Sequence, residues 1–174
     1  QSALAGGSNS LLLSGNATFG AAASGLVDLN VTGTSSVADN ITGTGSQTFT
    51  GRVNLTGDAT FTGTSGSFSG GLDGGANALG LNYSTLVTID GATTFSNIAS
   101  LTSTGPAELN GTINTTGLQS YGSAVTLLGA TDLTASNVTF GSTVAGGASP
   151  LNVTGDLFID GAVTNLAGLD VTGN

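Results

Sequence analysis

The sequence predicts an all-β protein built as a β-solenoid, in which the chain coils and each short strand stacks on its predecessor. Three observations favour this fold: apolar residues alternate with Thr, Asn or Asp, a Gly-bearing bend follows nearly every such segment, and the same small units recur. Little or no α-helix is expected, because Gly or a cluster of Ser, Thr and Asn interrupts nearly every window of the length a helix needs.

The expected strands are about five residues long and alternate with period two, so that one face of each is buried and the other is solvated. They end at Gly or Asp-Gly. The clearest are residues 26–32, 52–56, 58–62, 86–89, 151–154 and 169–172.

Repetition separates the two architectures that many short strands allow, an antiparallel sandwich or a solenoid. The unit LNVTG begins at Leu29 and at Leu151, LDVTG begins at Leu169, and IDGA begins at Ile89 and at Ile159. Self-similar units with few hairpin dipeptides favour the solenoid. We therefore expect one elongated domain over residues 1–174, with roughly 20 residues per coil, about eight coils and a length of about 40 Å.

The charge pattern points to the same fold. Arg52 is the single cation, there is no His, and ten acids give a net charge of −9. In a solenoid, equivalent positions lie about 4.8 Å apart, where two like charges repel by about 1 kcal/mol in water and by more near a low-dielectric surface. Thr, Ser and Asn can instead bond to their copies in neighbouring coils. Asp90 and Asp160 are expected to stack as equivalent residues of IDGA, and Arg52 to pair with Asp28 or Asp73.

This composition also argues against several partners. Nucleic acid and anionic membrane surfaces require clustered Lys and Arg, which the chain lacks. No segment reaches the roughly 20 apolar residues of a membrane helix, so membrane insertion is not expected. The chain contains no Cys, and it starts at Gln1 with no visible signal peptide, so we expect a processed protein or a piece of a larger one.

The stretch TTGLQSYGSAVTLLGATDLTASNVTFGSTVAGG, residues 115–147, resembles the repeats of filamentous-haemagglutinin-like large secreted bacterial adhesins, the two-partner-secreted exoproteins. NLTGDATFTG and LNVTGD are similar to other units of such chains. The resemblance implies a right-handed parallel β-helix, a place outside the cell or on its surface, and a structural or adhesive role. It supplies no catalytic residues.

Nine Asn-X-Ser/Thr sequons are candidate N-glycosylation sites of a surface glycoprotein. The alternative is that strand alternation itself creates them, with Asn and Thr outward and an apolar residue inward between them. The nine are Asn16, Asn30, Asn40, Asn54, Asn82, Asn110, Asn114, Asn137 and Asn152.

Catalysis is not expected, because the chain has no His for acid–base work and a single cation. Neither a cofactor nor a metal site is predicted, although residues 70–79 (GGLDGGANAL) weakly resemble a calcium-binding repeat. The expected function is a non-catalytic extracellular adhesin stalk or matrix component. Two alternatives are a filament subunit joined end to end through strand pairing and an ice-binding solenoid that uses Thr48-Phe49-Thr50 and Thr60-Phe61-Thr62. Expected partners are other copies, neighbouring repeats, or host or matrix glycans.

Overall fold

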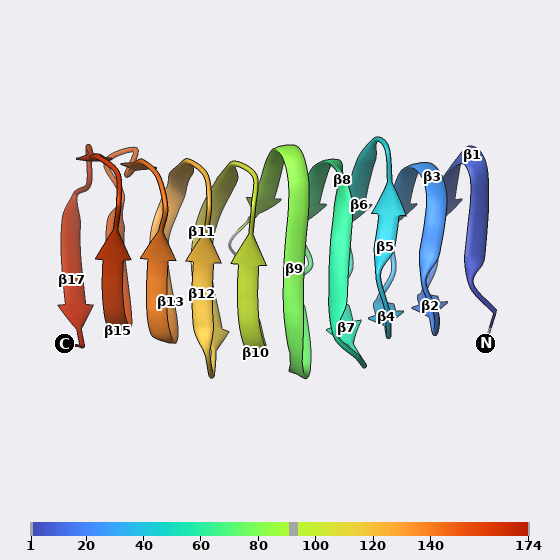
Figure 1. Cartoon of the computed structure of the whole chain (residues 1–174), viewed down its shortest axis with the longest axis horizontal. Helices are drawn as coiled ribbons and strands as arrows, with labels where there is room; N and C mark the ends of the chain where they lie inside the picture. Colours follow the sequence, from blue (N-terminus) through green and yellow to red (C-terminus); the bar gives the residue numbers. More distant parts are fainter. Residues whose placement is uncertain (1, 91–93, 174) are drawn as a thin grey trace.

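A computed structural model describes residues 2–90 and 94–173, which form a parallel β-helix with the turns stacked along one axis (Figure 1). Neighbouring turns pair in parallel, as in β2 (Ala17–Phe19) with β4 (Ser35–Val37) and β15 (Pro150–Ile159) with β17 (Gly168–Thr172). The predicted solenoid is confirmed, and the antiparallel sandwich is wrong.

The chain runs almost entirely through strands, and the described residues contain no helix. The described part of the chain therefore includes no helix that could cross a membrane. The remaining strands are β1 (Leu4–Leu13), β3 (Ala23–Val31), β5 (Ile41–Gly43), β6 (Ser46–Phe49), β7 (Val53–Leu55), β8 (Ala59–Phe68), β9 (Leu72–Ile89), β10 (Phe95–Ser103), β11 (Ala107–Thr115), β12 (Leu118–Tyr121), β13 (Val125–Phe140), β14 (Val144–Ala145) and β16 (Val163–Thr164).

Three inward-facing columns run the length of the rod, where a column is a set of residues paired one to one in successive turns. The first column is Leu4, Ala23, Ile41, Phe61, Leu81, Ser103, Tyr121, Phe140 and Ile159. The second is Leu11, Leu29, Gln47, Gly66, Val87, Ala107, Val125, Val144 and Val163. The third is Ala17, Ser35, Val53, Leu72, Phe95, Ile113, Leu133, Val153 and Val171.

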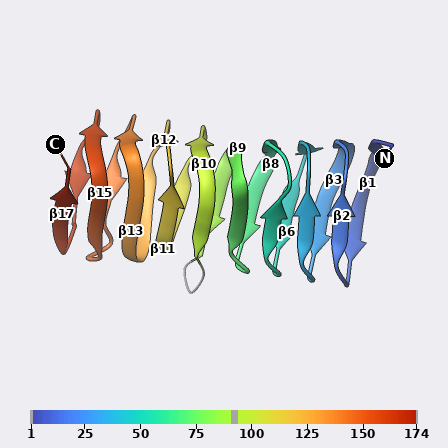
Figure 2. The same cartoon turned by 90° about the horizontal axis from the view of Figure 1, so that it is seen from below.

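The columns fix the length of a turn. The second column reaches from Leu11 to Val163 through one pairing per turn, so a turn averages about 19 residues. Individual turns differ in length, and the turn from Ala17 to Ser35 is shorter than the turn from Leu72 to Phe95. At about 4.8 Å per step the rod is about 40 Å long, and the N- and C-termini lie at its opposite ends (Figures 1 and 2).

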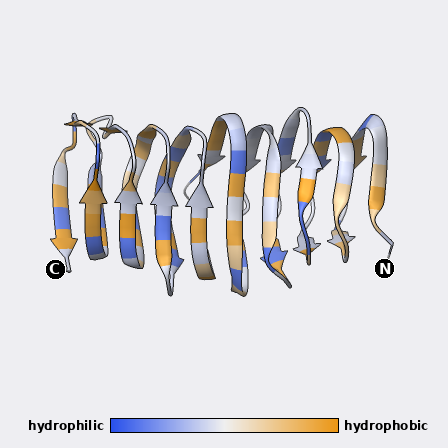
Figure 3. Ribbon diagram, in the orientation of Figure 1, coloured by the Kyte–Doolittle hydropathy of each residue, from blue (hydrophilic) through white to orange (hydrophobic). Residues whose placement is uncertain are grey.

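The core is a narrow strip of apolar side chains enclosed by the turns, and hydrophobic and hydrophilic residues alternate along many of the strands (Figure 3). Aromatic rings fill its middle. The Phe68 ring lies 5.1 Å from Phe49 and 5.9 Å from Phe95, measured between ring centroids, while Tyr121 stacks on Phe140 at 5.2 Å. Gly66 occupies an inward position because a Cβ there would collide with the ring of Tyr83.

Candidate functional site

A polar groove of about 470 Å³ lies on the outer face of the first column, between the turns that contain β8, β9 and β10. It exists because Ala78 and Gly80 carry almost no side chain where neighbouring turns have polar ones. The buried residues Ala59, Leu79 and Leu81 underlie it. Its polar lining comprises Asn40, Asp58, Thr60, Asn82, Ser100, Thr102 and Thr104.

Hydrogen bonds between turns hold this lining in place. The Asn40 Oδ1 atom accepts the Thr60 amide N–H at 2.8 Å, and the Asp58 Oδ1 atom accepts the Ala78 amide N–H at 2.8 Å. The Thr104 hydroxyl donates to Asn82 Oδ1 at 2.6 Å. These bonds use the oxygens of both Asn side chains, so their NH₂ groups can still donate to a ligand. The groove therefore offers mostly neutral donors and acceptors beside a single carboxylate.

None of the nine sequon Asn side chains is buried. Asn16, Asn30, Asn40, Asn82 and Asn152 are exposed, and Asn54, Asn110, Asn114 and Asn137 are half-buried. The middle residue of every sequon except Gly111 is buried, so strand alternation accounts for the pattern. Glycosylation itself stays a prediction.

The sequons differ in how far their amide nitrogens, the atoms that would carry a glycan, are engaged. The Nδ2 atom of Asn152 donates to Asp132 at 2.6 Å, and that of Asn110 donates to Asp90 at 3.4 Å. The Oδ1 atom of Asn114 is buried without a hydrogen-bond partner. The exposed Asn16, Asn30, Asn40 and Asn82 are therefore the sites best placed for modification.

Several acidic side chains lie beside uncharged residues of the neighbouring turns. Glu108 lies between Thr88 and Thr126, and Asp156 pairs with Asn137. The expected stacking of Asp90 on Asp160 is wrong. Ile159 belongs to the first column, whereas Ile89 pairs with Phe68 and Leu109 on another face, because the IDGA units are not a whole number of turns apart.

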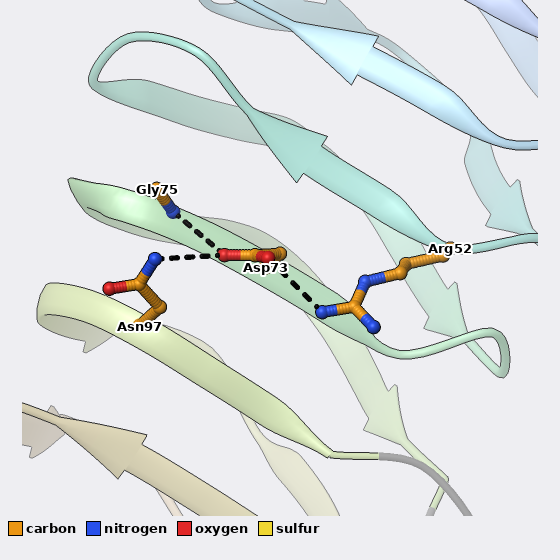
Figure 4. Close-up of polar contacts among 4 residues, drawn as sticks. All are labelled: Arg52, Asp73, Gly75 and Asn97. Carbon is orange, nitrogen blue, oxygen red and sulfur yellow. Dashed lines mark hydrogen bonds and ion pairs between the residues drawn. The ribbon is translucent and has the colours of Figure 1, made fainter.

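Of the two partners expected for Arg52, the structure selects Asp73, with Nη2 of Arg52 at 3.2 Å from Oδ2 of Asp73 (Figure 4). The Gly75 amide N–H and the Asn97 amide also donate to Asp73, and together with Arg52 they hold the pKa of this carboxyl below its ordinary value. Asp28 instead accepts bonds from the amide and hydroxyl of Ser46 and from the hydroxyl of Ser10, which also lower its pKa.

The glycine-rich segment that resembles a calcium repeat forms a bend instead. Gly75 and Ala76 both have positive φ, and the Asn77 amide donates to the carbonyls of Gly74 and Gly75 at 2.9 and 3.1 Å. Asn9 does the same for Gly6 and Gly7, so the sequence GG-X-N is a recurring bend that sequence reasoning missed. Within residues 2–90 and 94–173, no three His, Cys, Asp or Glu side chains gather where they could hold a metal ion.

A second missed motif is a buried Gln at a bend. The Gln47 Nε2 atom donates to the carbonyls of Ile41 and Thr62, and the Gln119 Nε2 atom donates to those of Ile113 and Thr134. The two Gln residues thus bond to carbonyls at the same sequence offsets before and after themselves. The aligned sequences ITGTGSQTF and INTTGLQSY, residues 41–49 and 113–121, could have revealed it.

A buried tyrosine hydroxyl completes each Gln motif. Tyr83 donates to Gln47 Oε1 at 2.8 Å, and Tyr121 donates to Gln119 Oε1 at 3.1 Å. Burial raises the pKa of both phenols, so they remain neutral donors. Each motif thus satisfies polar groups inside the core and fixes one bend.

The two threonine pairs considered for ice binding do not form one row. Phe49 and Phe61, the residues between the Thr pairs, are both buried, as expected. Phe61 belongs to the first column, whereas Phe49 pairs with Val31 and Phe68 on another face. On the outward side of the strands, Thr60 pairs with Gly80 of the next turn and Thr62 pairs with Asn82. Neither threonine row therefore continues into that turn.

No family model, curated protein or solved structure matches this chain. Its fold and surface chemistry therefore carry the functional argument.

Proposed function

We propose that the chain is a non-catalytic structural and adhesive element outside the cell, a rod that presents polar side chains at fixed spacing. The observation that supports it most is the continuity of the three columns from the first turn to the last. Inward residues in these columns supply cohesion, and outward Thr, Ser and Asn are left free to meet other molecules.

The polar groove is the proposed adhesive site, and its ligand class is a neutral glycan. Hydroxyl, amide and carboxylate groups from neighbouring turns line it, and a sugar needs such closely spaced donors and acceptors. A single acid, Asp58, and the absence of cationic side chains from its lining favour neutral sugars over anionic ones. A place outside the cell agrees with the accessible sequons and with the adhesin resemblance of residues 115–147.

A glycan array tests the adhesive role. Ala78→Gln adds a long side chain to the groove without removing the Ala78 amide N–H that Asp58 accepts. Ala130→Gln makes the same change at an exposed residue outside the groove lining and serves as the matched control. We expect the unmodified chain and the control to bind a neutral oligosaccharide and Ala78→Gln to bind it at least about tenfold more weakly.

Two results would contradict this function. Absence of binding to every glycan would remove the adhesive role, and inhibition of ice growth by the same preparation would favour the ice-binding alternative.

Mass spectrometry of protein from its natural source tests the sequons. Unmodified peptides across all nine Asn residues would remove the glycoprotein prediction.

A further inference from the structure

Leu118 is an exposed apolar side chain on the same outer face as the polar groove. It begins β12, which lies between β10 and β13 in the stack of turns (Figure 1). Leu118 is 46% exposed, and its neighbours in the two adjoining turns are Ser100 and Asn137. Turns therefore flank this leucine on both sides, and their polar side chains leave it open to solvent.

Two outward rows connect Leu118 with the floor of the groove, where a row is a set of outward residues side by side in successive turns. From the floor outward, the rows are Ala78–Ser100–Leu118 and Gly80–Thr102–Ser120. Successive turns are about 4.8 Å apart, so Leu118 lies about 10 Å from Ala78 along the rod. A ligand that fills the groove and extends along the rod by one more group therefore reaches this leucine.

The hydroxyl groups on this side of the groove are not used by the fold. On the opposite side, the Asn40 and Asp58 side chains accept backbone amides of the next turn. Among the described residues, in contrast, no hydrogen bond engages the side-chain hydroxyl of Ser100, Thr102 or Ser120. A hydroxyl can both donate and accept, so these three groups are available to a ligand.

Two of these hydroxyls adjoin Leu118 directly. Ser100 lies beside Leu118 in the preceding turn, and Ser120 lies two residues further along the same strand and hence on the same face. An apolar side chain and two free hydroxyls thus form one small cluster at the edge of the groove. Such a cluster fits a chemical group that combines a hydrogen-bond donor, an acceptor and a methyl group.

We propose that this cluster binds the acetamido group of a neutral sugar and that Leu118 determines the specificity. The Ser100 and Ser120 hydroxyls match the amide N–H and the carbonyl oxygen of that group, as acceptor and donor. Leu118 contacts its methyl group, which is stabilised by leaving water. A sugar with a hydroxyl at the same position leaves Leu118 without a contact. This inference rests on the proposed function and narrows the ligand class of the groove.

Calorimetric titration with two disaccharides tests the inference. Cellobiose and diacetylchitobiose share one β-linked backbone, and the second carries acetamido groups where the first carries hydroxyls. We expect the unmodified chain to bind diacetylchitobiose at least about fivefold more tightly than cellobiose. Leu118→Ala should remove most of this preference, because it deletes the contact with the methyl group and leaves both hydroxyls in place.

Leu128→Ala is the matched control. Leu128 is 47% exposed and lies outside the groove lining, because its neighbour Leu127 pairs with Leu109 on another face. This variant should keep the full preference, and circular dichroism should show that both variants fold like the unmodified chain.

Equal affinities for the two disaccharides would overturn the inference and leave the proposed function in place. A Leu118→Ala variant that keeps the preference would do the same. If the unmodified chain bound neither disaccharide but bound another neutral glycan on the array, only the inference would fail. Failure to bind any glycan would remove both.

Discussion

Residues 151–155 (LNVTG) and 169–173 (LDVTG) differ at one position and pair residue by residue in successive turns, yet their burial is opposite. Leu151 and Val153 are 0% and 1% exposed, whereas Leu169 and Val171 are 47% and 39% exposed. The difference is that a further turn covers the first segment. In this fold, burial depends on the neighbouring turns rather than on the local sequence, as in other repeat proteins.

The largest contrast is expected between two phenylalanines. Phe68 is fully buried and contacts the rings of Phe49, Phe61, Tyr83 and Phe95, whereas Phe158 is 55% exposed. Phe68→Ala should lower the free energy of unfolding by about 3–5 kcal/mol, and Phe158→Ala by less than about 1 kcal/mol. Urea unfolding followed by circular dichroism measures both, and equal losses would contradict the comparison.

The paired segments provide the next test. Leu151→Ala should cost about 2–4 kcal/mol because it leaves a cavity between two turns, and Leu169→Ala should cost less than about 1 kcal/mol. The same urea experiment, at a concentration where the chain is monomeric, compares them. If Leu169→Ala proved as costly as Leu151→Ala under those conditions, Leu169 would have to be buried in the monomer rather than exposed.

Buried hydrogen bonds should show a smaller contrast. Tyr83→Phe leaves Gln47 Oε1 without its donor inside the core and should cost about 1–3 kcal/mol. Tyr121→Phe tests the second Gln motif in the same way. Thr172→Val, which removes an exposed hydroxyl of the last turn, should cost less than about 0.5 kcal/mol. The thermal unfolding midpoint ranks the three variants, and a neutral Tyr83→Phe would show that the Gln47 bond adds nothing.

The smallest effect concerns pH. The pKa of Asp28 is lowered from its ordinary 3.8, so its bonds stabilise the fold above that value and are lost as the pH falls through the folded-state pKa. Asp28→Asn should therefore lose less stability than the unmodified chain on acidification below about pH 4. Asp170→Asn removes one charge from the last turn and is the control. If stability fell with pH in parallel for Asp28→Asn and the unmodified chain, Asp28 would not contribute to the pH dependence of stability.

Alternation and repetition were sufficient to predict the solenoid, the turn length of about 20 residues and the inward positions of Phe49 and Phe61. They did not predict where around the turn a repeated unit lies. Because the turns differ in length, the two IDGA units that contain Asp90 and Asp160 lie on different faces of the rod. A period-two pattern shows which side chains of a strand point inward, but it does not show on which face of the rod the strand lies.

The groove and the Gln motifs were also beyond the sequence pattern. The groove depends on small residues, Ala78 and Gly80, aligned beside larger ones from the turns on either side. Gln47 and Gln119 occupy positions where alternation expects an apolar residue, and only the carbonyls left unpaired at each bend explain them. Both features are set by contacts between turns.

The termini lie at opposite ends of the rod, and the hydrogen bonds between turns run along its axis (Figure 1). A pull on the two termini therefore loads these bonds one turn after another, as in a zipper. Each turn released would replace about 4.8 Å of rod by about 65 Å of extended chain. Under tension the rod would therefore lengthen stepwise, one turn at a time, and dissipate part of the applied work.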